Sequence, residues 1–211
     1  PVESRIMCML APLSTAIARG WKINKPGEDG IIEYHDLQDV EISYPKNMYE
    51  QYSTETDAGY WVRHRSKEIH SELKRLGLNQ LVEVGAGTGS VCGFLAQNGI
   101  DVAAIEPLKA GAIQIRKRGI QTICGRLEIV NFPSASIKSY GVFDVLEHIE
   151  NPSQLLDEMY RTLEPGGYLL VTVPCGQWLW GEMDKSIGHY RRYSTKRINE
   201  VVSRSGFTPI K

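Results

Sequence analysis

The chain has 211 residues, of which 42% are hydrophobic and 23% charged, and its formal net charge is −1. This length suits one full-sized core, and the balanced charge excludes a general attraction to nucleic acid or anionic membranes. The four cysteines form no C-x-x-C pair, which argues against a zinc ribbon or a disulfide framework and suits a reducing compartment. No apolar run reaches the ~20 residues of a membrane span, and the first residues lack a signal-peptide pattern. We expect a soluble cytoplasmic protein.

Residues 1–55 do not share the pattern of the rest of the chain. Pro26, Gly27 and Gly30 interrupt them, and residues 31–44 alternate loosely enough to suggest a short strand or hairpin. We therefore predict an N-terminal extension or cap over residues 1–55 and a second domain over residues 56–211.

From residue 59 onward, helical and strand patterns alternate. The first helix is expected at 59–76, where Trp61, Ile69, Leu73 and Leu76 fall near one face. Further helices are expected at 88–97, 107–118, 151–163 and 194–205, strands at 80–84, 101–106, 120–124, 139–144 and 168–173, and a turn at 164–167. This order predicts an α/β fold with a doubly wound, mostly parallel sheet, whose ligands bind at the carboxyl ends of the strands.

A glycine-rich loop follows the first strand of this pattern. Residues 81–90 read LVEVGAGTGS, and Glu106 ends the next strand, 21 residues after Gly85. Glycine lets the backbone turn sharply and lets a ligand lie against it, and an acid at the second strand end can bond a ribose diol. The third glycine comes one residue too early for the dinucleotide fingerprint G-x-G-x-x-G. The pattern predicts a nucleotide-like cofactor that needs no pyrophosphate cradle.

Three motifs together carry a family resemblance. They are E-x-G-x-G-x-G from Glu83, D-V-L-E-H at 144–148 and L-x-P-G-G at 163–167. They resemble the class I S-adenosylmethionine-dependent methyltransferases, in particular the small-molecule group that includes the ubiquinone-biosynthesis O-methyltransferases. The resemblance covers roughly residues 59–209 and implies a Rossmann-like fold with S-adenosylmethionine as cofactor and S-adenosylhomocysteine as product. The family's closing C-terminal hairpin is expected to be absent or truncated here.

The same resemblance implies a set of cofactor contacts. Glu83 would face the ammonium group, Glu106 the ribose, and Arg65 the carboxylate. Arg126 stands where the family has an acid beside the adenine, so the Leu127 amide, with Glu128 as an alternative acid, is left for the ring. The residues expected to bind the cofactor are Tyr60, Trp61, Arg65, Glu83, Gly85, Ala86, Gly87, Gly89, Glu106, Pro107, Gly125, Leu127, Phe143 and Asp144.

Methyl transfer needs in-line alignment and, for a hydroxyl acceptor, removal of a proton. The expected catalytic residues are His148, His189 and Asp144, with His148 favoured as the base because of its proximity to the cofactor. Alternatively, the Glu147–His148 pair only ties its loop to backbone amides. A similar E-x-x-E-H element holds a divalent ion in some O-methyltransferases of the resembling group. Three ligands on one short segment do not easily converge on an ion, so no metal is expected.

The loop after the last strand is rich in aromatic and basic side chains. The residues expected to bind the acceptor are Trp178, Trp180, His189, Arg192 and Tyr193. Such side chains suit a flat, sugar-like or anionic small molecule. The alternatives are that the two tryptophans pack on the N-terminal segment and that Trp61 lies in the core.

The sequence thus predicts O-methylation of a small molecule, with no nucleic acid partner. A nicotinamide-dependent oxidoreductase is the first alternative, disfavoured by the spacing of the third glycine and by L-x-P-G-G. A non-catalytic cofactor-binding module is the second. The acceptor, the oligomeric state and the role of residues 1–55 stay open.

Overall fold

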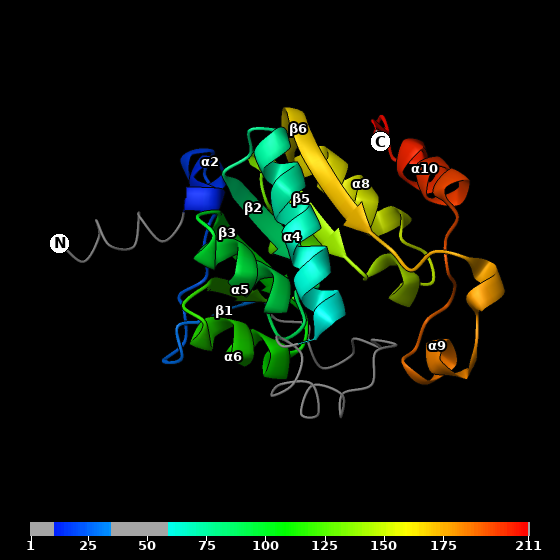
Figure 1. Ribbon diagram of the computed structural model, residues 1–211. Coiled ribbons are helices and arrows are strands. Elements are labelled where there is room, and N and C mark those ends of the chain that lie inside the picture. The colour runs from blue at the N-terminus through cyan, green and yellow to red at the C-terminus, as the bar shows by residue number, and fades with distance from the viewer. Residues whose placement is uncertain (1–10, 35–58, 211) are drawn as a thin grey trace.

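A computed structural model describes residues 11–34 and 59–210 of the chain. Its centre is a six-stranded sheet in the order β1-β4-β3-β2-β5-β6, with every neighbouring pair parallel (Figure 1). The strands are β1 (Ile32–Glu33), β2 (Gln80–Val84), β3 (Asp101–Glu106), β4 (Gln121–Cys124), β5 (Ile137–Phe143) and β6 (Leu163–Thr172). The predicted α/β fold with a parallel sheet is confirmed.

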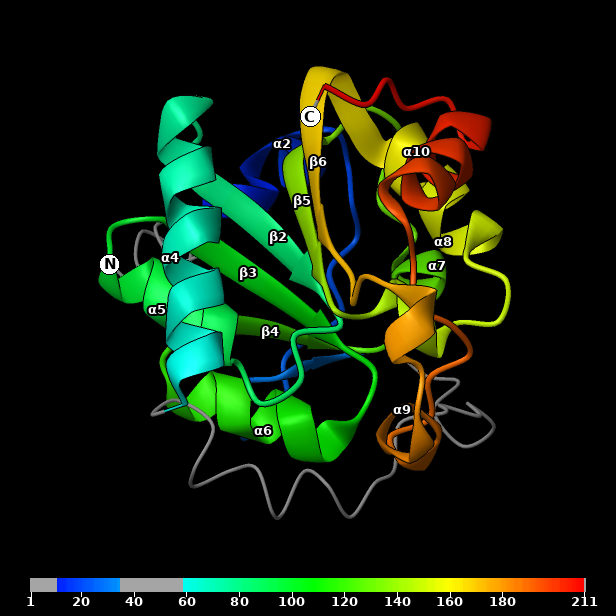
Figure 2. The same cartoon turned by 45° about the vertical axis from the view of Figure 1, so that its right-hand side comes forward.

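Helices cover both faces of this sheet. The α-helices are α2 (Ser14–Ala18), α4 (Tyr60–Arg75), α5 (Ser90–Gln97), α6 (Lys109–Lys117), α7 (Leu127–Val130), α8 (Ser153–Thr162), α9 (Glu182–Ser186) and α10 (Thr195–Arg204). Three 3₁₀ turns are η1 (Ala11–Leu13), η3 (Leu146–His148) and η4 (Gln177–Leu179). One apolar core lies between the sheet and α4, α5 and α6, and a second lies on the opposite face, against α2, α7, α8 and α10 (Figure 2).

The boundaries of β6 differ from the prediction. The strand begins at Leu163, so the expected turn at 164–167 lies inside it. Leu163 pairs with Ile137 and Tyr168 with Ser139, so the two strands keep their pairing around an irregularity. Gly166, at φ 78°, supplies the left-handed residue that this excursion requires. The turn chemistry read from the sequence is therefore present, but as a bulge within a strand.

The described part of the N-terminal extension belongs to the core of the sheet. β1 pairs with β4, which confirms a short strand near residue 32, and residues 35–44 of the expected hairpin lie outside the described part of the chain. Trp21 is 7% exposed, packs on Phe132 with ring centroids 4.6 Å apart, and donates its Nε1–H to the Val130 carbonyl at 3.0 Å. This segment therefore covers one face of the sheet near β4 and α7.

The environment of Trp61 excludes one of its two sequence interpretations. It is 66% exposed, so it is not a core residue, and the buried positions of α4 are Ser66, Ile69 and Leu73. The buried part of α4 begins after its first turn, because Ile69 and Leu73 pack with residues of α5 in one apolar core. The aromatic first turn of α4 precedes the packed part of the helix.

β6 forms one edge of the sheet. Within the described ranges its only strand partner is β5. A groove of about 970 Å³ runs along this edge and is lined by residues of α4, β6 and α10 and by Phe207–Ile210. No helix in the two described ranges is long and apolar enough to cross a bilayer.

Candidate cofactor and acceptor site

The glycine loop turns at the carboxyl end of β2. Gly85, Gly87 and Gly89 all have positive φ, at 73°, 60° and 82°. A Cβ on Gly85 would lie 2.6 Å from a Val145 methyl, whereas a Cβ on Gly87 would meet nothing within 4 Å. Gly85 is therefore required by close packing, and Gly87 leaves open space above the loop, where a ligand can approach the backbone. Ala86 between them is buried.

Glu106 ties this loop to the next strand. Its side chain is buried, and its two oxygens accept hydrogen bonds from the Gly87 amide at 2.8 Å and the Leu108 amide at 2.9 Å. Pro107 follows directly, partly buried. A carboxylate oxygen can accept more than one hydrogen bond, so this geometry leaves Glu106 acceptor capacity at the glycine loop. It fits the ribose contact expected there.

Glu83 is a buried carboxyl group just below the glycine loop. It is 3% exposed, and its Oε2 has no hydrogen-bond partner among the described residues. Burial raises its pKa to about 8, although the positive charge of Arg65 acts in the opposite direction. An unsatisfied buried acceptor is costly, and a cationic group would relieve that cost. The site therefore fits the ammonium group expected beside Glu83.

Arg65 reaches the site from α4 and forms an ion pair with Asp144 at the end of β5. The Thr172 hydroxyl donates to the other Asp144 oxygen at 3.0 Å. Asp144 has a left-handed backbone, φ 55°, which is uncommon away from glycine. The structure thus pairs two of the residues expected at the cofactor, Arg65 and Asp144, the second of which was also expected to take part in catalysis. Tyr60, 77% exposed, and Trp61 lie at the start of the same helix.

The residues expected beside the adenine lie after β4 and at the end of β5. The Gly125 amide donates to the Glu106 carbonyl at 3.1 Å, which keeps the loop after β4 beside β3. The side chains of Leu127 and Phe143 are buried in the two cores. Arg126 forms an ion pair with Glu128 at 2.8 Å, so the alternative acid is engaged by the residue that replaces the usual one.

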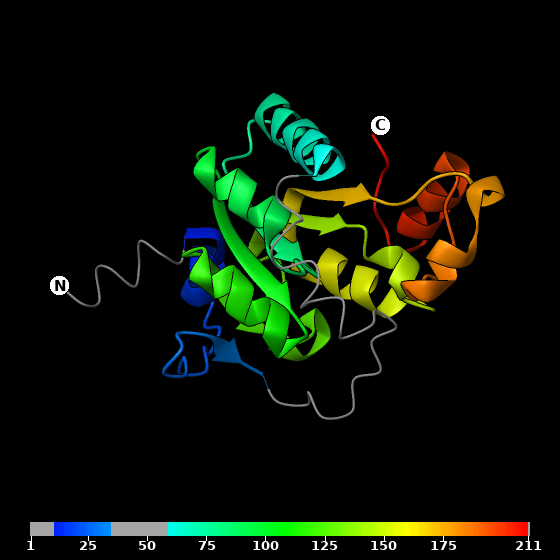
Figure 3. The same ribbon diagram turned by 60° about the horizontal axis from the view of Figure 1, so that its bottom comes forward.

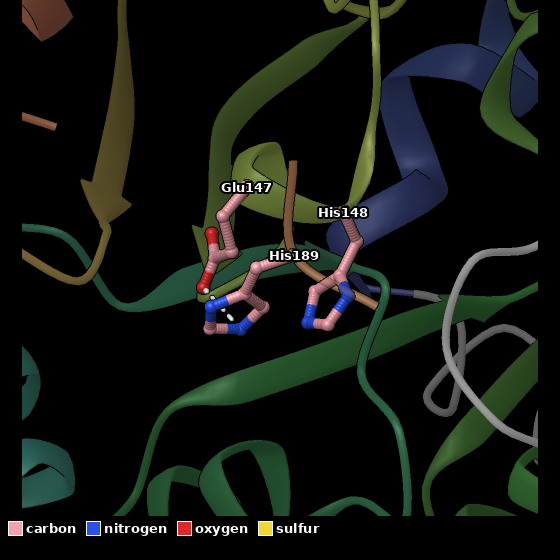
Figure 4. Close-up of side chains that lie close together, drawn as sticks. All are labelled: Glu147, His148 and His189. Carbon is pink, nitrogen blue, oxygen red and sulfur yellow. Dashed lines mark ion pairs between the residues drawn. The ribbon is translucent and has the colours of Figure 1, made fainter. Parts of the chain in front are cut away.

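Two histidines from different loops meet beside the end of β5. η3 carries Glu147 and His148, and β6 runs into the loop that carries η4, α9 and His189 (Figure 3). The two imidazole rings lie edge to face with centroids 4.6 Å apart. Ligand atoms of Glu147, His148 and His189 all lie within 4.8 Å of one another (Figure 4). No local sequence pattern links these three residues, because His189 comes from a distant loop.

The protonation states in this cluster are shifted by burial. Glu147 is 0% exposed, and within the described ranges neither of its oxygens has a hydrogen-bond partner; the His189 Nε2 lies 3.9 Å from Oε1. Burial, together with the negative charge of Asp144, raises the pKa of Glu147 to about 8. Burial and the neighbouring His189 lower the pKa of His148 to about 4. His148 is therefore a neutral imidazole near pH 7.

The remaining acceptor-binding candidates differ in exposure and in their partners. Trp178 is 85% exposed and Trp180 partly buried, so Trp178 does not pack on the described N-terminal segment. Tyr193 is 1% exposed and its hydroxyl donates to the Leu146 carbonyl at 3.2 Å, which makes it a core residue. Arg192 is bonded to Asp184. His189 is the one of the five that joins His148.

Asp184 is a site residue that the sequence analysis missed. It is 1% exposed and accepts hydrogen bonds from the Gly181 amide, the His189 Nδ1 and the Arg192 Nε. Its position five residues before His189 was a weak signal, because the contact depends on the turn that ends α9.

Comparison with known protein families matches residues 61–211 to a family described as a methyltransferase domain. The chain belongs to this family. A protein from Mycolicibacterium smegmatis named as a probable S-adenosylmethionine-dependent methyltransferase is 24% identical over 155 residues, covering 72% of this chain and 60% of that protein. The ubiquinone biosynthesis O-methyltransferase of Rickettsia prowazekii is 25% identical over 169 residues, covering 74% of this chain and 55% of its own length.

A solved structure shares the fold of this methyltransferase domain. Phosphoethanolamine N-methyltransferase 2 of Haemonchus contortus, in complex with S-adenosyl-L-methionine, superimposes with a TM-score of 0.62 and covers 86% of this chain and 46% of that one, at 20% identity. At that identity the likeness concerns the fold alone. It agrees with the Rossmann-like class I fold expected from the motifs.

Proposed function

We propose that this methyltransferase domain transfers the methyl group of S-adenosylmethionine to a hydroxyl group of a small molecule. The observation that carries the proposal is the pairing of His148 with His189 beside the end of β5, where a hydroxyl proton can be accepted. The names of the similar proteins include both an O- and an N-methyltransferase, so the family alone does not select the acceptor atom.

The cofactor half of the proposal rests on the two buried carboxyl groups. Glu83 offers an oxygen without a partner among the described residues to the ammonium group, and Glu106 offers acceptor capacity to the ribose hydroxyls. The space above Gly87 admits the cofactor to the loop between them. Arg65 can bind the cofactor carboxylate by exchanging it for Asp144, its present partner.

On the acceptor half, the protein must align the hydroxyl with the methyl carbon and sulfur and remove the proton. With its pKa lowered to about 4, His148 is a weak base near pH 7, so we assign the proton-accepting role to His189. The Nε2 of His189 faces the buried Glu147, and its ring contacts the ring of His148. A hydroxyl bound beside Nε2 would therefore meet a base whose position is fixed by these two neighbours.

The same cluster also fits a divalent cation. Two imidazoles and a carboxylate whose oxygens lack hydrogen-bond partners within the described ranges are suitable ligands for Zn²⁺ or a similar ion. Glu147, His148 and His189 would hold it, and a bound ion would polarise an acceptor hydroxyl as a Lewis acid. Asp144, from the D-V-L-E-H element, is bonded to Arg65 and Thr172 and is not part of this set.

Calorimetric titration with S-adenosylhomocysteine, with NADH as the comparison, tests the cofactor. Micromolar binding of the first without the second is expected, and binding of NADH alone would overturn the proposal in favour of an oxidoreductase. An acceptor screen with labelled cofactor then starts from hydroxylated aromatics and sugars, with and without a chelator. Cofactor binding without transfer to any acceptor would favour a non-catalytic binding module.

His189→Gln tests whether His189 acts as the base without a role in cofactor binding. We expect it to lower methyl transfer roughly 10²- to 10⁴-fold, the usual contribution of a general base, while S-adenosylhomocysteine still binds. His70→Gln is the matched control, because His70 lies on α4 and contacts the Asn98 carbonyl and the Phe94 ring, away from the histidine pair.

A further inference from the structure

The loop between β6 and α10 contains a buried carboxylate with three donors around it. Asp184 Oδ1 accepts from the His189 Nδ1 at 2.9 Å and from the Arg192 Nε at 2.8 Å, and Oδ2 accepts from the Gly181 amide at 3.0 Å. The guanidinium of Arg192 is always charged, and together with the Gly181 amide it holds Asp184 as an anion whose partners all lie within this loop.

An ionised carboxylate only accepts hydrogen bonds, so the ring nitrogen that faces it carries the proton. His189 Nδ1 must then be the protonated nitrogen of the neutral ring. Nε2 is left with its lone pair and lies 3.9 Å from Glu147 Oε1, beside the His148 ring. Asp184 bonds the Nδ1 side of the His189 ring, and this contact directs the Nε2 lone pair toward Glu147 and His148.

The backbone holds this arrangement against η3. The His189 amide donates to the Asp184 carbonyl at 2.9 Å, and the Tyr190 amide donates to the Glu147 carbonyl at 2.7 Å. Arg191 also donates to the Glu150 carbonyl at 2.8 Å. Two loops that are about forty residues apart in the chain are thereby joined at His189.

We propose that Asp184 is the positioning residue of the site: it fixes His189 in the Nδ1–H tautomer and presents the Nε2 lone pair between Glu147 and His148. The role of that lone pair in taking a hydroxyl proton rests on the proposed function, whereas the tautomer itself does not. Arg192 completes the device by balancing the buried negative charge of Asp184.

The tautomer is measured on the ¹⁵N-labelled full chain from long-range ¹H–¹⁵N spectra of the histidine rings, at a pH where the rings are neutral. The chain has five histidines, and the His189 signals are those lost in His189→Gln. We expect an Nδ1–H tautomer for His189. An Nε2–H tautomer in the unaltered protein would overturn the proposal without recourse to any variant.

Asp184→Ala removes both carboxylate oxygens and with them the acceptor of the His189 Nδ1–H. We expect the Nδ1–H form of His189 to lose its dominance over the Nε2–H form, with a folded chain by circular dichroism. Glu182→Ala is the matched control, because Glu182 lies on the same helix, is exposed and pairs with Lys185 at 2.6 Å. A dominant Nδ1–H tautomer in a folded Asp184→Ala chain would contradict the proposal.

Once an acceptor is known, Asp184→Ala should lower kcat about 10²-fold or more and leave KM and S-adenosylhomocysteine affinity nearly unchanged. A purely structural role would instead raise KM or weaken the folded state. If the tautomer is found as expected and the cofactor does not bind, the proposed function fails while the positioning role stands.

Discussion

At the scale of single residues, the site is built from buried carboxyl groups whose roles differ according to their partners. Glu106 is satisfied by two backbone amides, whereas Glu83 has an oxygen without a partner among the described residues. Asp144 is neutralised by Arg65, and Asp184 by Arg192. A buried carboxyl group thus anchors a loop, offers a site for a cation or serves as a counter-ion, depending on which donors the fold brings to it.

Glu106→Gln is expected to weaken S-adenosylhomocysteine binding by about 1–3 kcal/mol, the cost of losing hydrogen bonds to a buried carboxylate. Glu106 now accepts hydrogen bonds from two backbone N–H groups. The amide nitrogen of glutamine is a donor and would face one of these donors, so one of the two hydrogen bonds would be lost. Calorimetric titration measures the change, with Glu68→Gln on the exposed face of α4 as control. An unchanged affinity would show that Glu106 is not the ribose ligand.

At the scale of elements, the described N-terminal segment behaves as part of the sheet domain. Leu13, Ala16, Trp21 and Ile32 share a core cluster with residues of β4, β5 and α8. β1 extends the sheet on its β4 side by pairing Ile32 with Ile123. β1 lies on the far side of β4 from the histidine cluster, whereas η1 packs against β2, β3 and β5, so the described segment contributes to packing.

Trp21→Ala is expected to destabilise the protein by about 3–5 kcal/mol, the usual cost of removing a buried tryptophan side chain. The indole fills the space against Phe132 and satisfies the Val130 carbonyl. Urea denaturation measures the loss. Trp178→Ala, at a site 85% exposed, should change stability by less than about 0.5 kcal/mol. Equal effects of the two substitutions would contradict the structural role of the segment.

At the scale of the whole molecule, burial of ionisable groups links stability to pH. The net charge of −1 gives little overall repulsion, so individual buried groups dominate this dependence. Burial raises the pKa of Glu83 from 4.5 to about 8, so the folded chain holds a proton there that the unfolded chain has already lost. Stability from this group is complete below pH 4.5 and falls as pH rises to about 8.

Between these pH values the slope from Glu83 is up to about 1.4 kcal/mol per pH unit. Glu83→Gln is expected to flatten the corresponding part of the profile, because a neutral side chain has no proton to lose. Urea denaturation of both chains across this range measures the difference. Identical slopes would show that Glu83 keeps its ordinary pKa in the folded chain.

The sequence by itself determined the fold class and the order of strands, helices and motifs along the chain. The alternation of apolar strands with helical runs predicted the parallel sheet, and β2 and β3 have the expected bounds because their apolar residues are buried on both faces. The glycine positions were readable for the same local reason, since positive φ is cheap only without a Cβ.

Only the tertiary structure decided which side chains meet at the site. Arg65 pairs with Asp144 across 79 residues of chain, and His189 joins His148 from another loop. Tyr193 became a core residue although its neighbours line the loop surface. Such contacts depend on the packing of loops against the ends of β5 and β6. Because that packing brings together residues far apart in sequence, no local pattern specifies it.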